Sequence, residues 1–223
     1  MKPADQRILA GIRAELHRAV RYDDESIVND VWLRQRYDCG CFPRIAAART
    51  ATVETAWHEA GHAVAALAIG VRFSSASVHH GGRHEGRVYG IAGGSDLAFV
   101  VDAAGQIAER LRTWTMLERD DELRAWLPTW KSDGGDARRF RRAVGTRAER
   151  FGTGEQAECA AWRCSEQLLI PLRLKIREVA RALLVHPRYL PYAVVAAIGA
   201  DHPGSDARPQ PPQRGVASQS ARA

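Results

Sequence analysis

Apolar residues recur at helical spacing near the start of the chain. Residues 3–22 place an apolar side chain at every third or fourth position, which predicts an amphipathic helix. Residues 24–36 repeat this pattern, and the glycine and proline within 38–43 end it. We therefore expect a helical extension over residues 1–45, in which no residue pattern indicates chemistry.

Two different patterns follow this extension. Residues 50–69 are alanine-rich and apolar on most sides, which predicts a buried helix that ends at Gly70. Residues 71–78 and 86–91 have the alternating and β-branched character of strands, and a turn sequence at 79–82 separates them. This arrangement predicts a β-hairpin that flanks the buried helix.

Helical spacing returns in most of the remaining chain. The predicted helices cover residues 96–114, 118–126, 136–150 and 155–185, with a break or kink at Pro171, and a short apolar element covers 189–198. Residues 201–223 combine prolines with serines and arginines and predict a disordered tail. The expected fold class is therefore mainly α with a small β hairpin or sheet (α+β), in one domain over residues 46–200.

The composition excludes several classes of protein. The 223 residues are 45% hydrophobic and 26% charged, which does not fit collagen-like, disulfide-scaffold or wholly disordered chains. The mean hydropathy is −0.32, and no apolar run approaches the ~18 residues of a membrane span. The first residues also lack the apolar segment of a secretory signal. We expect a cytoplasmic protein.

The net charge of +6 comes almost entirely from arginine. A clustered basic face would attract nucleic acid, but these arginines are interleaved with acidic residues along most predicted helices. The pattern does not favour a nucleic-acid partner, although a basic regulator that binds through the N-terminal helices stays an alternative. The cysteines, which are Cys39, Cys41, Cys159 and Cys164, lack the paired spacing of a zinc ribbon and predict reduced thiols.

The candidate chemistry lies in the buried helix, where the sequence has the form H-E-x-x-H. His58 and His62 are four residues apart, so both imidazoles project from one helix face and can share a zinc ion. Glu59 lies next to the first histidine, where it can take a proton from zinc-bound water and return it to a leaving amine. Such polar residues are costly inside an apolar helix unless they have a purpose. Gly61 in mid-helix predicts that another group approaches its backbone closely.

A family resemblance extends this interpretation. The sequence His58-Glu59-Ala60-Gly61-His62-Ala63 resembles the zinc motif of the FtsH-type ATP-dependent metallopeptidases, and residues 104–110 are similar to that family's Gly-Gly-Arg-Ala-Ala-Glu-Glu helix. The predicted hairpin falls where the family has its substrate-cleft edge strand. The resemblance implies a zincin-like domain with zinc as its cofactor, Glu59 as the general base, and a polypeptide substrate.

The resemblance also implies a third zinc ligand, an aspartate that opens a later helix. Residues 132–136 are the matching place, and both Asp133 and Asp136 are candidates. A helical apolar pattern follows Asp136, whereas two glycines follow Asp133, so we favour Asp136 and keep Asp133 as a cap or alternative ligand. Glu109 is a further acidic candidate for the third ligand, but we favour two other roles equally: a group that orients a ligand imidazole, or an ordinary solvated glutamate.

Other polar residues carry weaker expectations. The hairpin turn holds His79, His80, His84 and Glu85. Loop histidines are usually solvated, so we do not expect them to bind metal.

The chain departs from the resembled family in two ways. It has no G-x-x-x-x-G-K-[ST] phosphate loop and no membrane span, so we expect cleavage of flexible or unfolded polypeptides, or a separate unfoldase or oligomer partner. The alternative function is a non-proteolytic metal-binding or interaction protein derived from the same domain.

Overall fold

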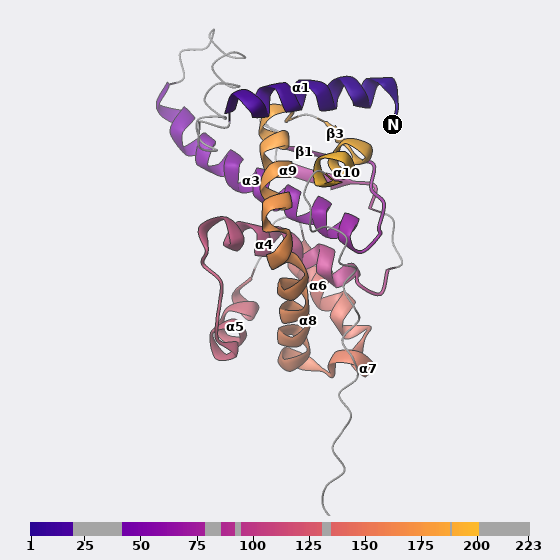
Figure 1. Ribbon diagram of the computed structural model, residues 1–223. Coiled ribbons are helices and arrows are strands. Elements are labelled where there is room, and N and C mark those ends of the chain that lie inside the picture. The colour runs from indigo at the N-terminus through magenta and orange to yellow at the C-terminus, as the bar shows by residue number, and fades with distance from the viewer. Residues whose placement is uncertain (20–41, 79–85, 92–94, 131–134, 188, 201–223) are drawn as a thin grey trace, which may run out of the picture.

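The computed structural model describes residues 1–19, 42–78, 86–91, 95–130, 135–187 and 189–200. The described part of the chain is mainly helical with one small antiparallel sheet, which confirms the predicted α+β class (Figure 1). The helix expected over 24–36 and the tail over 201–223 lie outside the described residues. None of the described helices combines the length and apolarity that crossing a membrane requires.

Helix α3 (Phe42–Ala68) runs through the middle of the fold and carries the H-E-x-x-H sequence. It begins earlier than the predicted residue 50. From Val53 to Ala66 its apolar residues are buried, as the alanine-rich pattern predicted. Helices α4 (Ala98–Thr113) and α9 (Arg173–Val185) pack along it.

Helix α4 is the second central element. It contacts α3 on one side and α6 (Asp136–Gly145) and α8 (Gly154–Leu169) on the other. Its inward residues, among them Val100, Ile107 and Leu111, are buried as the helical spacing predicted. The elements around α8 are α5 (Asp120–Trp126), η1 (Leu127–Thr129), α7 (Ala148–Phe151) and η2 (Ile170–Leu172).

Two of the predicted long helices are divided. The 136–150 segment forms α6 and α7, with a break after Gly145. The 155–185 segment forms α8 and α9 with η2 between them, and Pro171 lies in η2 as the sequence predicted. A proline lacks the N–H that a continuous helix needs at that position.

The sheet has the strand order β2-β1-β3, and both pairings are antiparallel. Strands β1 (Ser75–Val78) and β2 (Gly86–Tyr89) are the predicted hairpin, although the first strand is shorter than expected. Strand β3 (Leu190–Pro191) was not predicted as a strand. It adds to the other side of β1, so β2 lies at the edge of the sheet.

The two ends of the described chain lie together (Figure 1). Helix α1 (Pro3–Ala19) contacts α9 and α10 (Tyr192–Ala200). Leu9 and Ile12 are buried in this contact region. The N-terminal helix is therefore packed on the body of the protein.

Candidate metal centre

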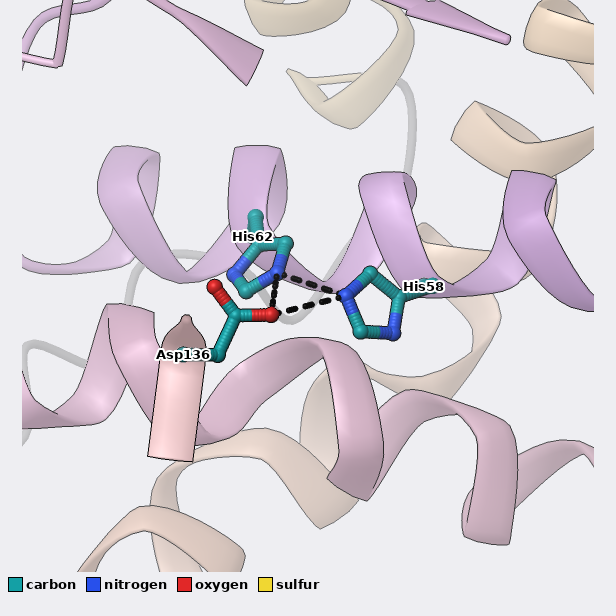
Figure 2. Close-up of side chains that lie close together, drawn as sticks. All are labelled: His58, His62 and Asp136. Carbon is teal, nitrogen blue, oxygen red and sulfur yellow. Dashed lines mark hydrogen bonds and ion pairs between the residues drawn. The ribbon is translucent and has the colours of Figure 1, made fainter. Parts of the chain in front are cut away.

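His58, His62 and Asp136 converge at one point between α3 and α6. Figure 2 shows the two imidazoles and the carboxylate turned toward one another. The two Nε2 atoms lie 3.0 Å apart, and Asp136 Oδ2 lies 3.2 Å from His58 Nε2 and 3.5 Å from His62 Nε2. The structure thus brings together the two histidines and the aspartate favoured by the sequence, and this group could hold a metal ion.

The other nitrogen of His62 fixes the orientation of its ring. His62 Nδ1 lies 2.6 Å from the carbonyl oxygen of Val101 in α4. A carbonyl oxygen can only accept a hydrogen bond, so the proton of the ring is on Nδ1. A neutral His62 therefore presents a lone pair on Nε2, toward Asp136.

Glu109 fixes the ring of His58 in the same way. His58 Nδ1 donates to Glu109 Oε1 at 2.6 Å, while Gln106 donates to the other carboxylate oxygen. This is the orienting contact expected of Glu109, whose carboxylate lies on the far side of the imidazole from Asp136. A neutral His58 therefore also presents its Nε2 lone pair to the cluster.

Three lone-pair-bearing atoms thus face one another, and a positive charge among them is needed to offset their repulsion. Where that charge is a proton, it resides on His58. Burial lowers the pKa of His58, but hydrogen bonds to Asp136 and Glu109 outweigh this effect and raise the pKa to about 10. The positive charge can equally be a metal ion, since all three groups are metal ligands in their unprotonated forms.

Helix α6 supplies the aspartate at its first turn. Asp136 is buried, and although burial raises its pKa, the hydrogen bond from His58 and the electrostatic effect of the two imidazoles hold the pKa well below the usual range. One turn later, the Phe140 ring lies 5.5 Å from that of Trp130 and 6.1 Å from that of Trp162. These aromatic contacts anchor the start of α6, so the carboxylate has a fixed place.

Gly105 leaves the space that an ion would need. A Cβ at position 105 would lie 2.5 Å from His58 Nε2 and 2.6 Å from His62 Nε2. Any side chain there would occupy the region into which both lone pairs point. This mid-helix glycine of α4 was missed at the sequence level, although the reasoning used for Gly61 applies to it equally.

Gly61 brings α3 and α4 into close contact, as its position in the motif predicted. A Cβ at Gly61 would lie 2.4 Å from the carbonyl oxygen of Ala104 and 2.6 Å from the Cβ of Ala108. The two helices therefore pack backbone to backbone at this point. That approach places Val101, Gly105 and Glu109 of α4 against the two histidines.

Glu59 lies beside the edge strand. It is buried, and the space in front of its side chain is provided by Gly86 of β2, where a Cβ would lie 2.7 Å from Glu59 Cγ. Burial raises the pKa of Glu59, while the nearby charges of His62 and His58 oppose this shift. The raised pKa makes Glu59 a stronger base than an exposed glutamate.

Several predicted residues are not in this cluster. Asp133, the alternative ligand, lies outside the described residues. The same holds for the turn residues and the first cysteine pair, which are His79, His80, His84, Glu85, Cys39 and Cys41. Cys159 and Cys164 are free thiols, as expected, and neither belongs to the metal-binding group found in the described part of the chain.

The donor set fits zinc. Ligand atoms that share a tetrahedral zinc ion at ~2.0–2.2 Å lie about 3.3–3.6 Å from one another. The three separations in the cluster, from 3.0 to 3.5 Å, are close to this range. Two imidazoles and one carboxylate also leave the fourth position of a catalytic zinc site open.

Comparison with protein-family models, curated proteins and solved structures gives no match for this chain.

Proposed function

We propose that this protein is a zinc-dependent metallopeptidase with a zincin-like active site. His58, His62 and Asp136 hold the metal, and Glu59 is the general base. The observation that carries the proposal is the convergence of three lone pairs within 3.5 Å of one another, with both outer histidine nitrogens already hydrogen-bonded. The resemblance of residues 58–63 and 104–110 to the FtsH-type peptidases favours peptide hydrolysis as the reaction.

The residues around the site divide the chemistry between them. When bound, zinc supplies a Lewis acid that polarises the scissile carbonyl and lowers the pKa of water. Glu59 takes the proton of the attacking water and passes it to the leaving amine. Its raised pKa suits this exchange, because a carboxyl group with a pKa nearer to neutral both accepts and returns a proton more readily.

Strand β2 provides a place for the substrate. It lies at the edge of the sheet, so an extended polypeptide can pair with its outer side through main-chain hydrogen bonds. Gly86, the first residue of β2, lies against Glu59, so a chain paired there would pass beside the general base. This mode of binding favours flexible or unfolded segments as substrates, with a separate unfoldase supplying folded ones.

The test combines zinc analysis with cleavage of a labelled, unfolded polypeptide by the full chain. Wild-type protein should contain about one zinc per chain. E59Q should keep its zinc while its turnover falls about 10²–10⁴-fold, because only the base is lost. E54Q is the matched control: Glu54 lies in α3 about one turn earlier, is exposed, and pairs with Arg112 away from the cluster.

Two results would contradict the proposal in different ways. A wild-type chain that binds zinc but cleaves no polypeptide would be a metal-binding protein without peptidase activity. A chain that binds no zinc would show that the cluster is not a metal site.

A further inference from the structure

Helix α4 contacts the outer side of both proposed histidine ligands. The Val101 carbonyl oxygen holds His62 Nδ1, and Glu109 holds His58 Nδ1. Asp136 is held as well, but through an intermediary, because Arg139 lies between it and Asp102 of α4. The contacts to the two histidines are direct, whereas the contact to Asp136 passes through Arg139.

Arg139 bridges two carboxylates with different nitrogens of its guanidinium. Its Nη2 donates to Asp136 Oδ1, and its Nε donates to Asp102 Oδ1 at 3.0 Å. The planar guanidinium holds these two donors in a fixed relative orientation. The position of Asp102 on α4 therefore sets the position of the Asp136 oxygen that faces away from the histidines.

From this geometry we infer that Arg139 is a positioning residue for the metal centre and that it acts on Asp136 while Asp102 holds it in place. The inference rests on the proposed zinc site. A carboxylate turns readily about its last side-chain bond and can exchange its two oxygens. With Oδ1 engaged by Arg139, Oδ2 is the oxygen that stays toward His58 and His62.

Exposure indicates that this bridge orients a group more than it stabilises the fold. The side chain of Arg139 is 55% exposed, whereas that of Asp136 is 6% exposed. Water screens the exposed side of this ion pair, and the buried Asp136 carboxylate keeps its contact with His58 when Arg139 is replaced. An effect of Arg139 on the cluster should therefore appear in metal affinity before it appears in stability.

The direction in which zinc affinity changes when Arg139 is replaced distinguishes lost orientation of Asp136 from the loss of a positive charge. A guanidinium beside the cluster repels a divalent cation, so removing its charge should by itself strengthen zinc binding. Losing the orientation of Asp136 should instead weaken binding about 10–100-fold, as the loss of an outer partner does at other metal sites. Weaker binding after removal of a positive charge is therefore opposite to the direct charge effect and is the result expected from lost orientation.

The experiment measures zinc affinity of the full chain by competition with a chromophoric chelator. The variants are R139Q, D102N, the double variant R139Q/D102N, and R142Q as control. Arg142 belongs to the same helix, so R142Q reports the effect of removing one charge from α6. We expect R139Q and D102N to bind zinc more weakly than R142Q, and the loss of affinity in the double variant to be smaller than the product of the two single losses.

The non-additive result follows because Asp102 orients Asp136 only through Arg139, although the charge of Asp102 also acts directly on the nearby His62. If R139Q does not fold, R139K replaces it, since an ammonium group cannot reproduce the fork that holds both carboxylates. If R139Q binds zinc as tightly as R142Q, the inference is wrong while the proposed function stands. The same holds if the losses of zinc affinity in the two single variants multiply in the double variant. A wild-type chain that binds no zinc would end both the proposed function and this inference.

Discussion

The backbone of Gly105 lies directly against the imidazole of His58: a Cβ at position 105 would lie 2.5 Å from both Cε1 and Nε2 of that ring. The same Cβ would lie 2.6 Å from His62 Nε2. The absence of a side chain at this position thus keeps open the space into which both histidines present their lone pairs.

Substituting alanine for Gly105 should abolish zinc binding. The added methyl group would separate the two rings or occupy the position of the ion, and we expect the zinc content to fall from about one per chain to near zero. G11A is the matched control, because a Cβ added at Gly11 in helix α1 would meet no atom within 4 Å. Full zinc content in G105A would show that the ion binds elsewhere.

A second glycine substitution tests the contact between α3 and α4. G61A should lower the free energy of unfolding by about 1–3 kcal/mol, because its Cβ would collide with the backbone of Ala104. This loss should outweigh the gain of ~1 kcal/mol in helix propensity. Urea unfolding measures the free energy of unfolding of both variants, and that of G11A should be equal to or higher than the wild-type value. A G61A protein as stable as G11A would mean that the two helices separate without cost.

Zinc affinity should depend on pH well above the ordinary range of histidine. The pKa of His58 is raised to about 10, so its proton stays on the ring through neutral pH and zinc must displace it. Affinity should therefore rise with pH, about tenfold per unit between pH 7 and 9, and binding should release about one proton. Calorimetry in two buffers of different ionisation enthalpy measures that proton. Constant affinity above about pH 7.5 would indicate an unshifted histidine.

Substituting Gly86 should displace the Glu59 carboxylate without changing the zinc ligands. A Cβ at position 86 would lie 2.9 Å from Glu59 Oε1 and 2.5 Å from Thr55 Cγ2, so G86A should displace the carboxylate or the edge strand. We expect turnover to fall roughly 10–100-fold, as small misplacements of catalytic groups do. Zinc affinity should stay within about twofold of wild type, since Gly86 does not border the ligand atoms. Loss of zinc in G86A would contradict this separation.

The sequence predicts those parts of the fold that depend on local patterns. The helical spacing locates α4 and the buried α3, and Pro171 marks the break between α8 and α9. The four-residue spacing of His58 and His62 places both rings on one face, and the apolar pattern after Asp136 predicts the start of α6. Each of these follows from a repeat or a spacing that the chain itself contains.

The features that the sequence does not predict depend on tertiary contacts. Strand β3 is two residues long, too short for any period to be recognised, and exists because β1 has a free edge beside it. The hydrogen bond to His62 comes from a backbone carbonyl at Val101, and a backbone group has no residue type that could identify it. The bridge from Asp102 to Asp136 through Arg139 likewise requires α4 and α6 to be placed in space first.

Helix α4 therefore supports both imidazoles of the proposed centre from behind, and supports the carboxylate only through Arg139 of α6. When α4 moves away from α3, the outer contacts of both imidazoles are lost in the same step, whereas Asp136 keeps its contact with Arg139 of its own helix. A metal ion bound by both histidines should therefore oppose the separation of α3 and α4, and amide hydrogen exchange in the middle of α4 should slow when the metal is added.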